Sequence, residues 1–222
     1  MFDYQLDDTI ATITMNDGKA NAVSSRFLEG MNAALDRAEA DKASAVILTG
    51  REGMFSAGFD LKELQTGAEA QLALIKGGFE LLVRLFEFKK PLLAACDGHG
   101  IGMGAFLLMA CDTRVGSQGS HKFSLPETAI GMDLNPLLVA LAKARITKRY
   151  LTRVAIQSEN LGPDMAVETG LLDLVVEPAA LMPTTRGIAE QLAKLPGAYG
   201  RNKAFVRADT LADMRAYLEQ IS

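Results

Sequence analysis

Residues 90–112 read KPLLAACDGHGIGMGAFLLMACD, and this stretch decides the fold of the chain. Its first part, residues 91–96, is a short continuous apolar run, which is typical of a strand buried on both faces of a sheet. Glycine then occupies every second position from 98 to 104, and a second apolar run covers residues 103–111. The glycines, together with Asp97 and His99, interrupt a segment that would otherwise have the length of a membrane span. The pattern therefore predicts a strand, a glycine-rich turn at 98–104 and a buried helix.

Upstream of this stretch, strands and helices alternate. Residues 9–15 are rich in β-branched side chains and are predicted to pair with residues 2–6 in a hairpin. A helix capped by Ser24 or Ser25 follows, because apolar side chains recur at helical spacing at positions 27, 28, 31, 34, 35 and 38. The next predicted elements are a buried strand at 45–49, a glycine-bearing loop at 50–60 and a helix at 72–88.

Downstream, the chain becomes mostly helical. Asn135 and Pro136 are a strong helix start, with an asparagine cap and proline in the first turn. Gly170 suits the position just after a helix end. Short strands are predicted at 113–115, 121–124 and 172–176, and helices at 148–156, 163–169, 182–195 and 201–222. The elements together predict an α/β body with a helical C-terminal part.

Composition and charge exclude several classes of protein. Of the 222 residues, 49% are hydrophobic and 23% are charged, which is ordinary for a soluble globular domain. The net charge is −4 and the chain has no basic block, which argues against nucleic-acid binding. Two cysteines and two histidines predict neither a disulfide framework nor a metal site. The acidic N-terminus does not resemble a signal peptide, so we expect a cytoplasmic protein without a membrane partner.

Two glycine-bearing segments at the ends of buried strands are candidates for ligand binding. They are residues 55–61, FSAGFDL, and residues 97–106, DGHGIGMGAF. Glycine lets a backbone turn sharply and approach a ligand closely, so such turns can direct free N–H groups at a polarised oxygen. A helix that starts at the second turn would add the field of its positive end. The alternative is that these glycines only form tight turns.

Five segments, in this order, resemble the motifs of the crotonase (enoyl-CoA hydratase/isomerase) superfamily. The resemblance covers most of the chain, and several ordered motifs are far more specific than one. The segments are DGKANA (17–22), FSAGFDLK (55–62), the stretch 90–112 quoted above, FSLPETAIG (123–131) and AVETGLLDLV (166–175).

The resemblance implies a fold and an assembly. It implies a spiral of ββα units over residues 1–180, followed over residues 181–222 by a helical region of the kind that the family uses to form trimers. The chain resembles a short member of the family, without the final helical segment of typical ones. The family acts on acyl-CoA thioesters, so coenzyme A enters as part of the substrate and no cofactor is implied.

The predicted helix at 201–222 bears on the assembly. It carries a partial apolar stripe that either its own body or a neighbouring chain must cover. Together with the resemblance, this stripe predicts a homotrimer or a dimer of trimers. The stripe consists of Phe205, Leu211, Met214, Tyr217 and Leu218.

The resemblance also assigns the binding site. The backbone N–H groups of Phe59 and Met103 form the oxyanion hole, which polarises the thioester carbonyl and stabilises an enolate. Because these donors belong to the main chain, Met103 can stand where many members have glycine. The positions that match substrate contacts in the two loops and in the N-terminal segment are Lys19, Ala20, Ala22, Ala57, Gly58, Asp60, Leu61 and Gly102.

The pattern of carboxylates points to the reaction. Hydratases of the family carry two glutamates, of which Glu127 is retained here and the other is replaced by Phe106. One base suits migration of a double bond, because it removes a proton at C2 and returns it at C4. The single glutamate therefore resembles the Δ3-Δ2-enoyl-CoA isomerases. Asp133 is either a second carboxylate in the pocket or a loop residue near a helix start.

Other interpretations stay open at this point. A weak hydratase and a non-catalytic acyl-CoA-binding member are both compatible with the loss of one glutamate. Residues 100–105 also fit a dinucleotide-binding fingerprint, but no acidic residue ends a second strand about twenty residues later, as ribose binding requires. We interpret His99 as a structural residue. Asp60 and Asp112 match family positions that are structural and bond the backbone of a loop.

Overall fold

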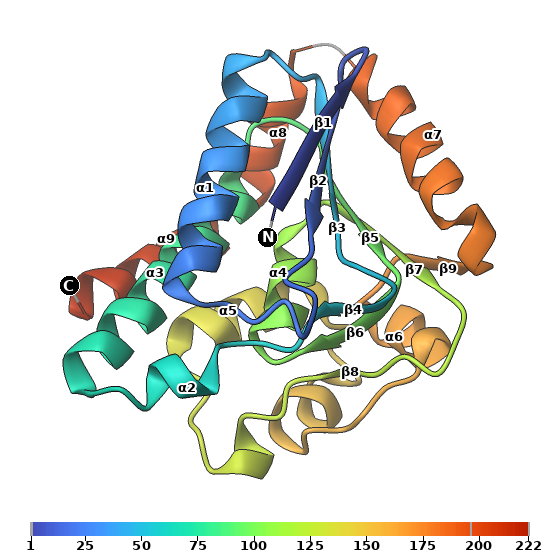
Figure 1. The fold of residues 1–222 in the computed structure, drawn as a ribbon. Coiled ribbons are helices and arrows are strands. Elements are labelled where there is room, and N and C mark those ends of the chain that lie inside the picture. The colour runs from blue at the N-terminus through green and yellow to red at the C-terminus, as the bar shows by residue number, and fades with distance from the viewer. Residues whose placement is uncertain (1, 196, 222) are drawn as a thin grey trace.

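The computed structural model describes residues 2–195 and 197–221, and it builds the chain around two β-sheets (Figure 1). The larger sheet has the strand order β1-β2-β3-β5-β7-β9, and the smaller sheet has the order β4-β6-β8. β1 and β2 are antiparallel, whereas the other pairs are parallel. The strands of the larger sheet are β1 (Phe2–Asp7), β2 (Ile10–Met15), β3 (Ala45–Thr49), β5 (Leu92–Cys96), β7 (Thr113–Ser117) and β9 (Leu174–Val176). The strands of the smaller sheet are β4 (Gly53–Ser56), β6 (Gly98–Ile101) and β8 (Phe123–Ser124).

A repeated unit winds the chain between the two sheets. Three times, a strand of the larger sheet leads to a strand of the smaller sheet and then to helices. This repeat confirms the predicted spiral of ββα units. The helices that follow the three units are α2 (Leu61–Leu64) and α3 (Ala68–Glu87), then α4 (Met103–Ala110), then α5 (Pro136–Arg145).

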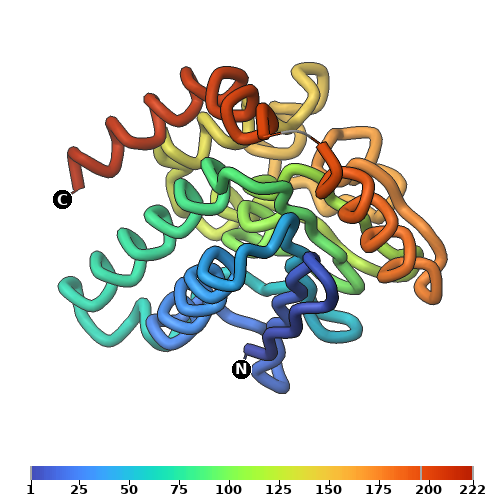
Figure 2. Tube along the Cα trace, turned by 90° about the horizontal axis from the view of Figure 1, so that it is seen from above, coloured from blue at the N-terminus to red at the C-terminus, as the bar shows by residue number. Residues whose placement is uncertain are grey.

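The main sheet separates two hydrophobic layers. Along β3, Val46 and Leu48 face one core cluster while Ala45 and Ile47 face the other, as the period of two in a strand requires. α7 (Leu181–Ala193) covers the second cluster on one side of the sheet (Figure 1). α1 (Ser25–Ala40), α3 and α9 (Ala208–Gln220) lie side by side on the other (Figure 2).

The sequence predicted several elements correctly. Ser24 caps α1 by accepting a hydrogen bond from the backbone of Phe27, and the six apolar positions predicted for this helix are its buried residues. Asn135 caps α5 in the same way, with Pro136 in its first turn. Gly170 ends α6 (Pro163–Thr169) in a left-handed conformation. Within the described residues, no helix has the length and hydropathy that crossing a bilayer requires.

The predictions for the two glycine segments missed the smaller sheet. The loop predicted at 50–60 contains β4, and most of the turn predicted at 98–104 is β6. The reason is the close approach of these two strands. A Cβ added to Gly98 would lie 2.0 Å from the backbone nitrogen of Met54, so the strand tolerates only glycine there and lacks the usual pattern of side chains.

The prediction of one terminal helix was wrong. The chain forms α8 (Tyr199–Val206) and α9, with a break at Arg207, whose side chain is buried and donates to the carbonyl of Phe86. Phe205 is 77% exposed and does not join the apolar stripe, whereas Leu211 and Met214 are buried against the body of the same chain. Pro196 and Ser222, within the predicted region 181–222, and Met1, within 1–180, lie outside the described residues.

The helix predicted at residues 148–156 also differs from the structure. In its place the chain forms a short π-helical segment, Thr152–Ile156. Helix α2 was not predicted, whereas the remaining predicted helices and strands differ from the structure only at their ends. The division into regions 1–180 and 181–222 stays a prediction. In the structure, α7 packs on the main sheet, and α9 packs on α3 and α5.

Candidate active site

A cavity of about 780 Å³ gathers the residues that the sequence singled out. Its walls come from the loop before α1, the β4–α2 segment, α3, the first turn of α4, the segment after β8, α5 and α9. All thirteen predicted site residues line it, although their individual roles stay predictions. They are Lys19, Ala20, Ala22, Ala57, Gly58, Phe59, Asp60, Leu61, Gly102, Met103, Phe106, Glu127 and Asp133.

The two glycine loops meet inside this cavity. Gly58 has a φ of +97°, and a Cβ on it would lie 3.0 Å from the carbonyl oxygen of Ile101 and 3.3 Å from the nitrogen of Met103. Gly102, with a φ of +53°, ends β6 and turns the chain into α4. Only glycine allows both this contact and this turn without strain.

Backbone hydrogen bonds hold the first loop so that one donor stays free. The N–H of Val23 donates to the carbonyl of Gly58 at 2.8 Å, and the N–H of Asp60 donates to the carbonyl of Val23 at 3.0 Å. Between them, the N–H of Phe59 makes no hydrogen bond with any described residue. The N–H of Met103, in the first turn of α4, also has no such partner. Two backbone donors at adjoining loops are therefore available to a ligand oxygen.

Glu127 is the buried carboxylate of the cavity. The residue is only 8% exposed, and its Oε2 atom has no hydrogen-bond partner among the described residues. A Cβ added to Gly102 would lie 3.6 Å from its Oε1, so the carboxyl group sits beside the start of α4. Burial raises the pKa of Glu127, because desolvation disfavours the ionised form.

The N-terminal part of the cavity is built by two polar residues that the sequence analysis did not single out. The carboxylate of Asp17 accepts from the N–H groups of Lys19 at 2.7 Å and Asn21 at 2.9 Å, which folds the loop carrying Lys19, Ala20 and Ala22. Burial alone would raise the pKa of Asp17, but these backbone donors outweigh it and lower the pKa. The side-chain amide of Asn21 donates to the carbonyl of Phe55 at 3.1 Å and so ties this loop to β4. The signal for both was the DGKANA segment itself.

Three further polar residues take different places. Asp60 caps α2 by accepting from the N–H groups of Lys62 and Glu63, and it also lines the cavity. Asp133 lines the cavity but is exposed to solvent. His99 does not line it. Its Nδ1 accepts from the backbone of Lys122 at 2.9 Å, which agrees with a structural role.

An apolar wall completes the cavity. The ring of Phe59 packs edge-on against Phe79 of α3, with centroids 6.4 Å apart, and Phe79 packs against Tyr217 of α9 at 6.2 Å. The sequence placed Phe79 and Tyr217 in helical stripes, but a stripe does not show which of its members face a cavity. The other apolar residues of this wall are Leu64, Ile75, Ile130, Met132 and Leu138.

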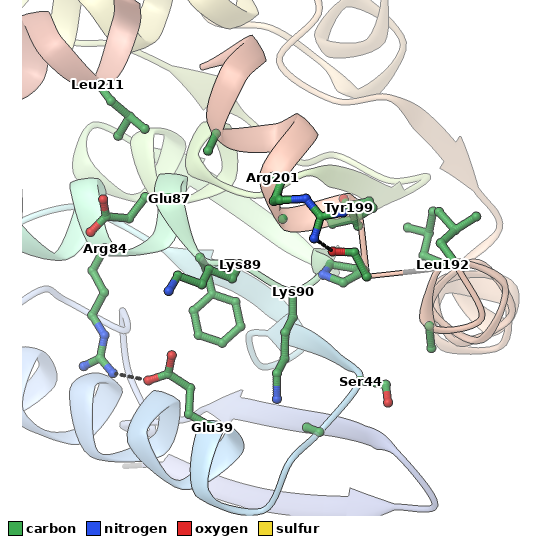
Figure 3. A pocket seen from close by; sticks show the side chains of 18 of the residues that line it. Glu39, Ser44, Arg84, Glu87, Lys89, Lys90, Leu192, Tyr199, Arg201 and Leu211 are labelled. Atoms are coloured by element: carbon green, nitrogen blue, oxygen red, sulfur yellow. Dashed lines mark hydrogen bonds and ion pairs between the residues drawn. The ribbon is translucent and has the colours of Figure 1, made fainter. Parts of the chain in front are cut away.

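A second cavity, of about 1040 Å³, lies between the ends of α1 and α3 and the helices α7 to α9 (Figure 3). Its lining contains none of the predicted site residues. Charged side chains such as Arg84 and Glu39, 3.4 Å apart, dominate the view. The smaller cavity is therefore the candidate site, since it holds all the predicted site residues and brings free backbone donors together with an unpartnered carboxylate oxygen.

Comparison with known proteins identifies the family. The sequence model of the enoyl-CoA hydratase/isomerase family matches residues 5–220. The fold and the two loops define the crotonase class, and the chain belongs to the enoyl-CoA hydratase/isomerase family. A probable enoyl-CoA hydratase of Rhizobium meliloti is 32% identical over 90% of this chain and 78% of the relative. A probable enoyl-CoA hydratase of Bacillus subtilis is 37% identical, but the match spans 57% of this chain and half of the relative.

Solved structures agree with this assignment. An enoyl-CoA hydratase/isomerase family protein from Pseudomonas syringae has a TM-score of 0.96 and 39% identity, over 99% of this chain and 95% of that one. The human mitochondrial Δ3-Δ2-enoyl-CoA isomerase has a TM-score of 0.90 and 26% identity, over 100% of this chain and 92% of that one. The fold is therefore that of the crotonase family.

Proposed function

We propose that the protein is an enoyl-CoA isomerase that moves a double bond from C3 to C2 of an acyl-CoA thioester. The observation that carries the proposal is the single buried carboxylate, Glu127, with an unpartnered oxygen beside two free backbone donors. Phe106, where family hydratases carry their other glutamate, cannot transfer a proton. The similarity to the human isomerase supports the same reaction.

The proposed reaction is a proton transfer within the substrate. The N–H groups of Phe59 and Met103 bind the thioester oxygen, so the carbonyl accepts electron density as the C2 proton leaves. The carboxylate of Glu127 takes that proton, and the electron pair spreads over the dienolate. The protonated Glu127 then returns the proton at C4, which places the double bond between C2 and C3. Nothing is added or lost, and no redox cofactor or metal takes part.

The remaining predicted residues bind the substrate. We assign the coenzyme A part to the segment with Lys19, Ala20 and Ala22 and to the loop with Ala57 and Leu61. The ammonium of Lys19 is exposed and suits a phosphate. The apolar wall with Phe79 and Tyr217 receives the acyl chain, because apolar side chains favour an alkyl group over water.

A hydratase is the second candidate. Asp133 lines the same cavity as Glu127, so a second carboxyl group is within the site and could act on a water molecule. Asp133 is exposed to solvent, whereas Glu127 is buried beside the free backbone donors, and this difference favours isomerisation by Glu127 alone. A non-catalytic member that only binds acyl-CoA is the third.

A panel of 2-enoyl- and 3-enoyl-CoA thioesters, followed by mass and ultraviolet absorbance, distinguishes the three. Isomerisation leaves the mass unchanged and creates the absorbance of a conjugated thioester, whereas hydration adds the mass of water. We expect migration to exceed hydration. Efficient hydration with negligible migration would support the hydratase, and binding without turnover would support the third candidate.

We also propose that the chain assembles as a trimer or a dimer of trimers, with residues 181–222 in the contact. Phe205 and Val206 of α8 are 77% and 86% exposed, and covering two such neighbouring apolar side chains favours association. Light scattering should give a trimer or hexamer, and Phe205→Asp should weaken it. A stable monomer at micromolar concentration would contradict the assembly.

A further inference from the structure

Helix α3 contains two adjacent glycines in the middle of its twenty residues, at positions 77 and 78. Glycine weakens a helix interior relative to alanine, so a packing requirement is the natural explanation for such a pair. The two positions differ in what they meet. A Cβ on Gly77 would lie 2.8 Å from the Cδ1 atom of Leu28, which is the far end of a flexible side chain.

Gly78 instead meets both residues of the oxyanion hole. A Cβ there would lie 2.6 Å from the Cε1 and Cζ atoms of the Phe59 ring and 3.3 Å from the Cε atom of Met103. Gly78 is buried and does not itself line the cavity. The side chains of the two donor residues, which come from different loops, thus pack at one point on α3.

We propose that Gly78 is a positioning residue that sets the geometry of the oxyanion hole; the inference rests on the proposed function. The bare backbone at Gly78 forms a notch that seats the Phe59 ring against Phe79. The backbone of the Phe59 loop is held on both sides by hydrogen bonds to Val23. A methyl group in the notch therefore pushes the Phe59 ring away from α3. Because hydrogen bonds hold the residues on both sides, the displacement is taken up at Phe59 itself and turns its N–H.

The test compares Gly78→Ala with Gly77→Ala, which makes the same change one residue earlier in the same helix. A further control, Gly187→Ala in α7, places a methyl group where nothing lies within 4 Å. Turnover of a 3-enoyl-CoA is measured together with the absorbance of a bound 2,4-dienoyl-CoA. This conjugated thioester absorbs at longer wavelength when its carbonyl is polarised, so it reports the hole directly and not the stability of the fold.

We expect Gly78→Ala to lower kcat by about 100-fold, the size of effect that follows a misplacement of about 1 Å. KM should change little, and the shift of the bound chromophore should shrink. Gly77→Ala and Gly187→Ala should keep the wild-type kcat and the full shift. A Gly78→Ala variant with the wild-type kcat and the wild-type shift of the bound chromophore would overturn the inference.

A double-mutant cycle with Phe59→Leu tests the cause. Leucine keeps the backbone N–H but leaves room in the notch, so Gly78→Ala should cost much less in this background. The same comparison applies if Gly78→Ala alone folds poorly, because the double variant has space for the methyl group. An equal loss in both backgrounds would overturn the inference. A wild type that neither shifts the chromophore nor turns over any enoyl-CoA would overturn the proposed function first, and the inference with it.

Discussion

A buried carboxylate lies at each end of helix α4, and the two have different surroundings. At the N-terminal end, the carboxyl group of Glu127 lies beside Gly102, and its Oε2 has no partner among the described residues. At the C-terminal end, Asp112 follows the last turn. Its Oδ2 accepts from the backbone of Leu92, the hydroxyl of Tyr199 and the ammonium of Lys203, each at 2.9 Å.

Positive charge gathers at the Asp112 end. Its Oδ1 lies 2.7 Å from Lys203 Nζ and 2.8 Å from the Arg207 guanidinium. Arg145 donates to the carbonyls of Met109 and Cys111, where the helix dipole is negative. Burial lowers the pKa of Lys203 to about 8, while Asp112 opposes that shift. The two carboxylates therefore differ in their charged neighbours. Asp112 is surrounded by cations and by three donors to its Oδ2, whereas no cation among the described residues pairs with Glu127, which suits the proposed proton transfer.

The largest expected effect is at the Glu127 end. Glu127→Gln keeps the shape of the side chain and removes the proton acceptor, so turnover should fall by roughly 10²–10⁴. The affinity for acyl-CoA should change little, since the donors of the hole belong to the backbone. Steady-state kinetics and calorimetric titration measure the two quantities. Unchanged turnover of every enoyl-CoA would make Asp133 or a non-enzymatic role the better interpretation.

At the Asp112 end, the expected effect is on stability. Asp112→Asn leaves Lys203 and Arg207 as buried charges without a counter-ion, which should lower the free energy of unfolding by about 3–5 kcal/mol. Urea unfolding measures this. Asp173→Asn is the matched control, because Asp173 is more exposed and pairs with Arg114, and it should cost less. Equal stability of Asp112→Asn and the wild type would remove the contrast between the two ends.

The pH dependence sharpens the contrast. The base must be ionised, and burial raises the pKa of Glu127, so kcat/KM should fall with decreasing pH already above the ordinary range of a glutamate. The raised pKa also affects stability. At a pH below the pKa that Glu127 has in the unfolded chain, its protonation stabilises the folded state, and this contribution is lost as the pH rises through its pKa in the folded state. At neutral pH, Glu127→Gln should therefore unfold no more easily than the wild type. An acid limb at the pKa of a free glutamate would contradict the assigned burial.

The smallest expected effect concerns α9, which follows α8 and contributes to the cavity that holds Glu127. α8 is anchored at Asp112, and α9 carries Tyr217 into the wall of the cavity. Tyr217→Ala should enlarge the cavity and shift the preference toward longer acyl chains by about tenfold, the lower end of the discrimination that one methylene group gives. Values of kcat/KM across a series of chain lengths measure this, with Leu218→Ala as a neighbouring control. An unchanged preference would place the acyl chain elsewhere.

The sequence predicted those parts whose signals are local. The cap at Ser24, the start at Asn135 and the apolar face of α1 follow from side chains a few residues apart, and all are present. The thirteen site residues predicted from the family motifs also line one cavity. Strands β4 and β6 were not predicted, because glycines allow the close contact between them and leave no alternation of apolar and polar side chains to detect. The terminal helix is interrupted at Arg207, which pairs with the distant Asp112, and no local pattern shows this break or the place of Tyr217 in the cavity.

Proton transfer by Glu127 is tested directly with a 3-enoyl-CoA that is labelled with deuterium at C2 and turned over in ordinary water. A single buried carboxylate that both removes and returns the proton should carry part of the label to C4 of the 2-enoyl product, and mass spectrometry can locate it there. Glu127→Gln should slow formation of the product by the same factor of roughly 10²–10⁴ and remove the transfer of label. A product formed at the wild-type rate by Glu127→Gln, or a hydrated product in place of the migrated double bond, would contradict the account.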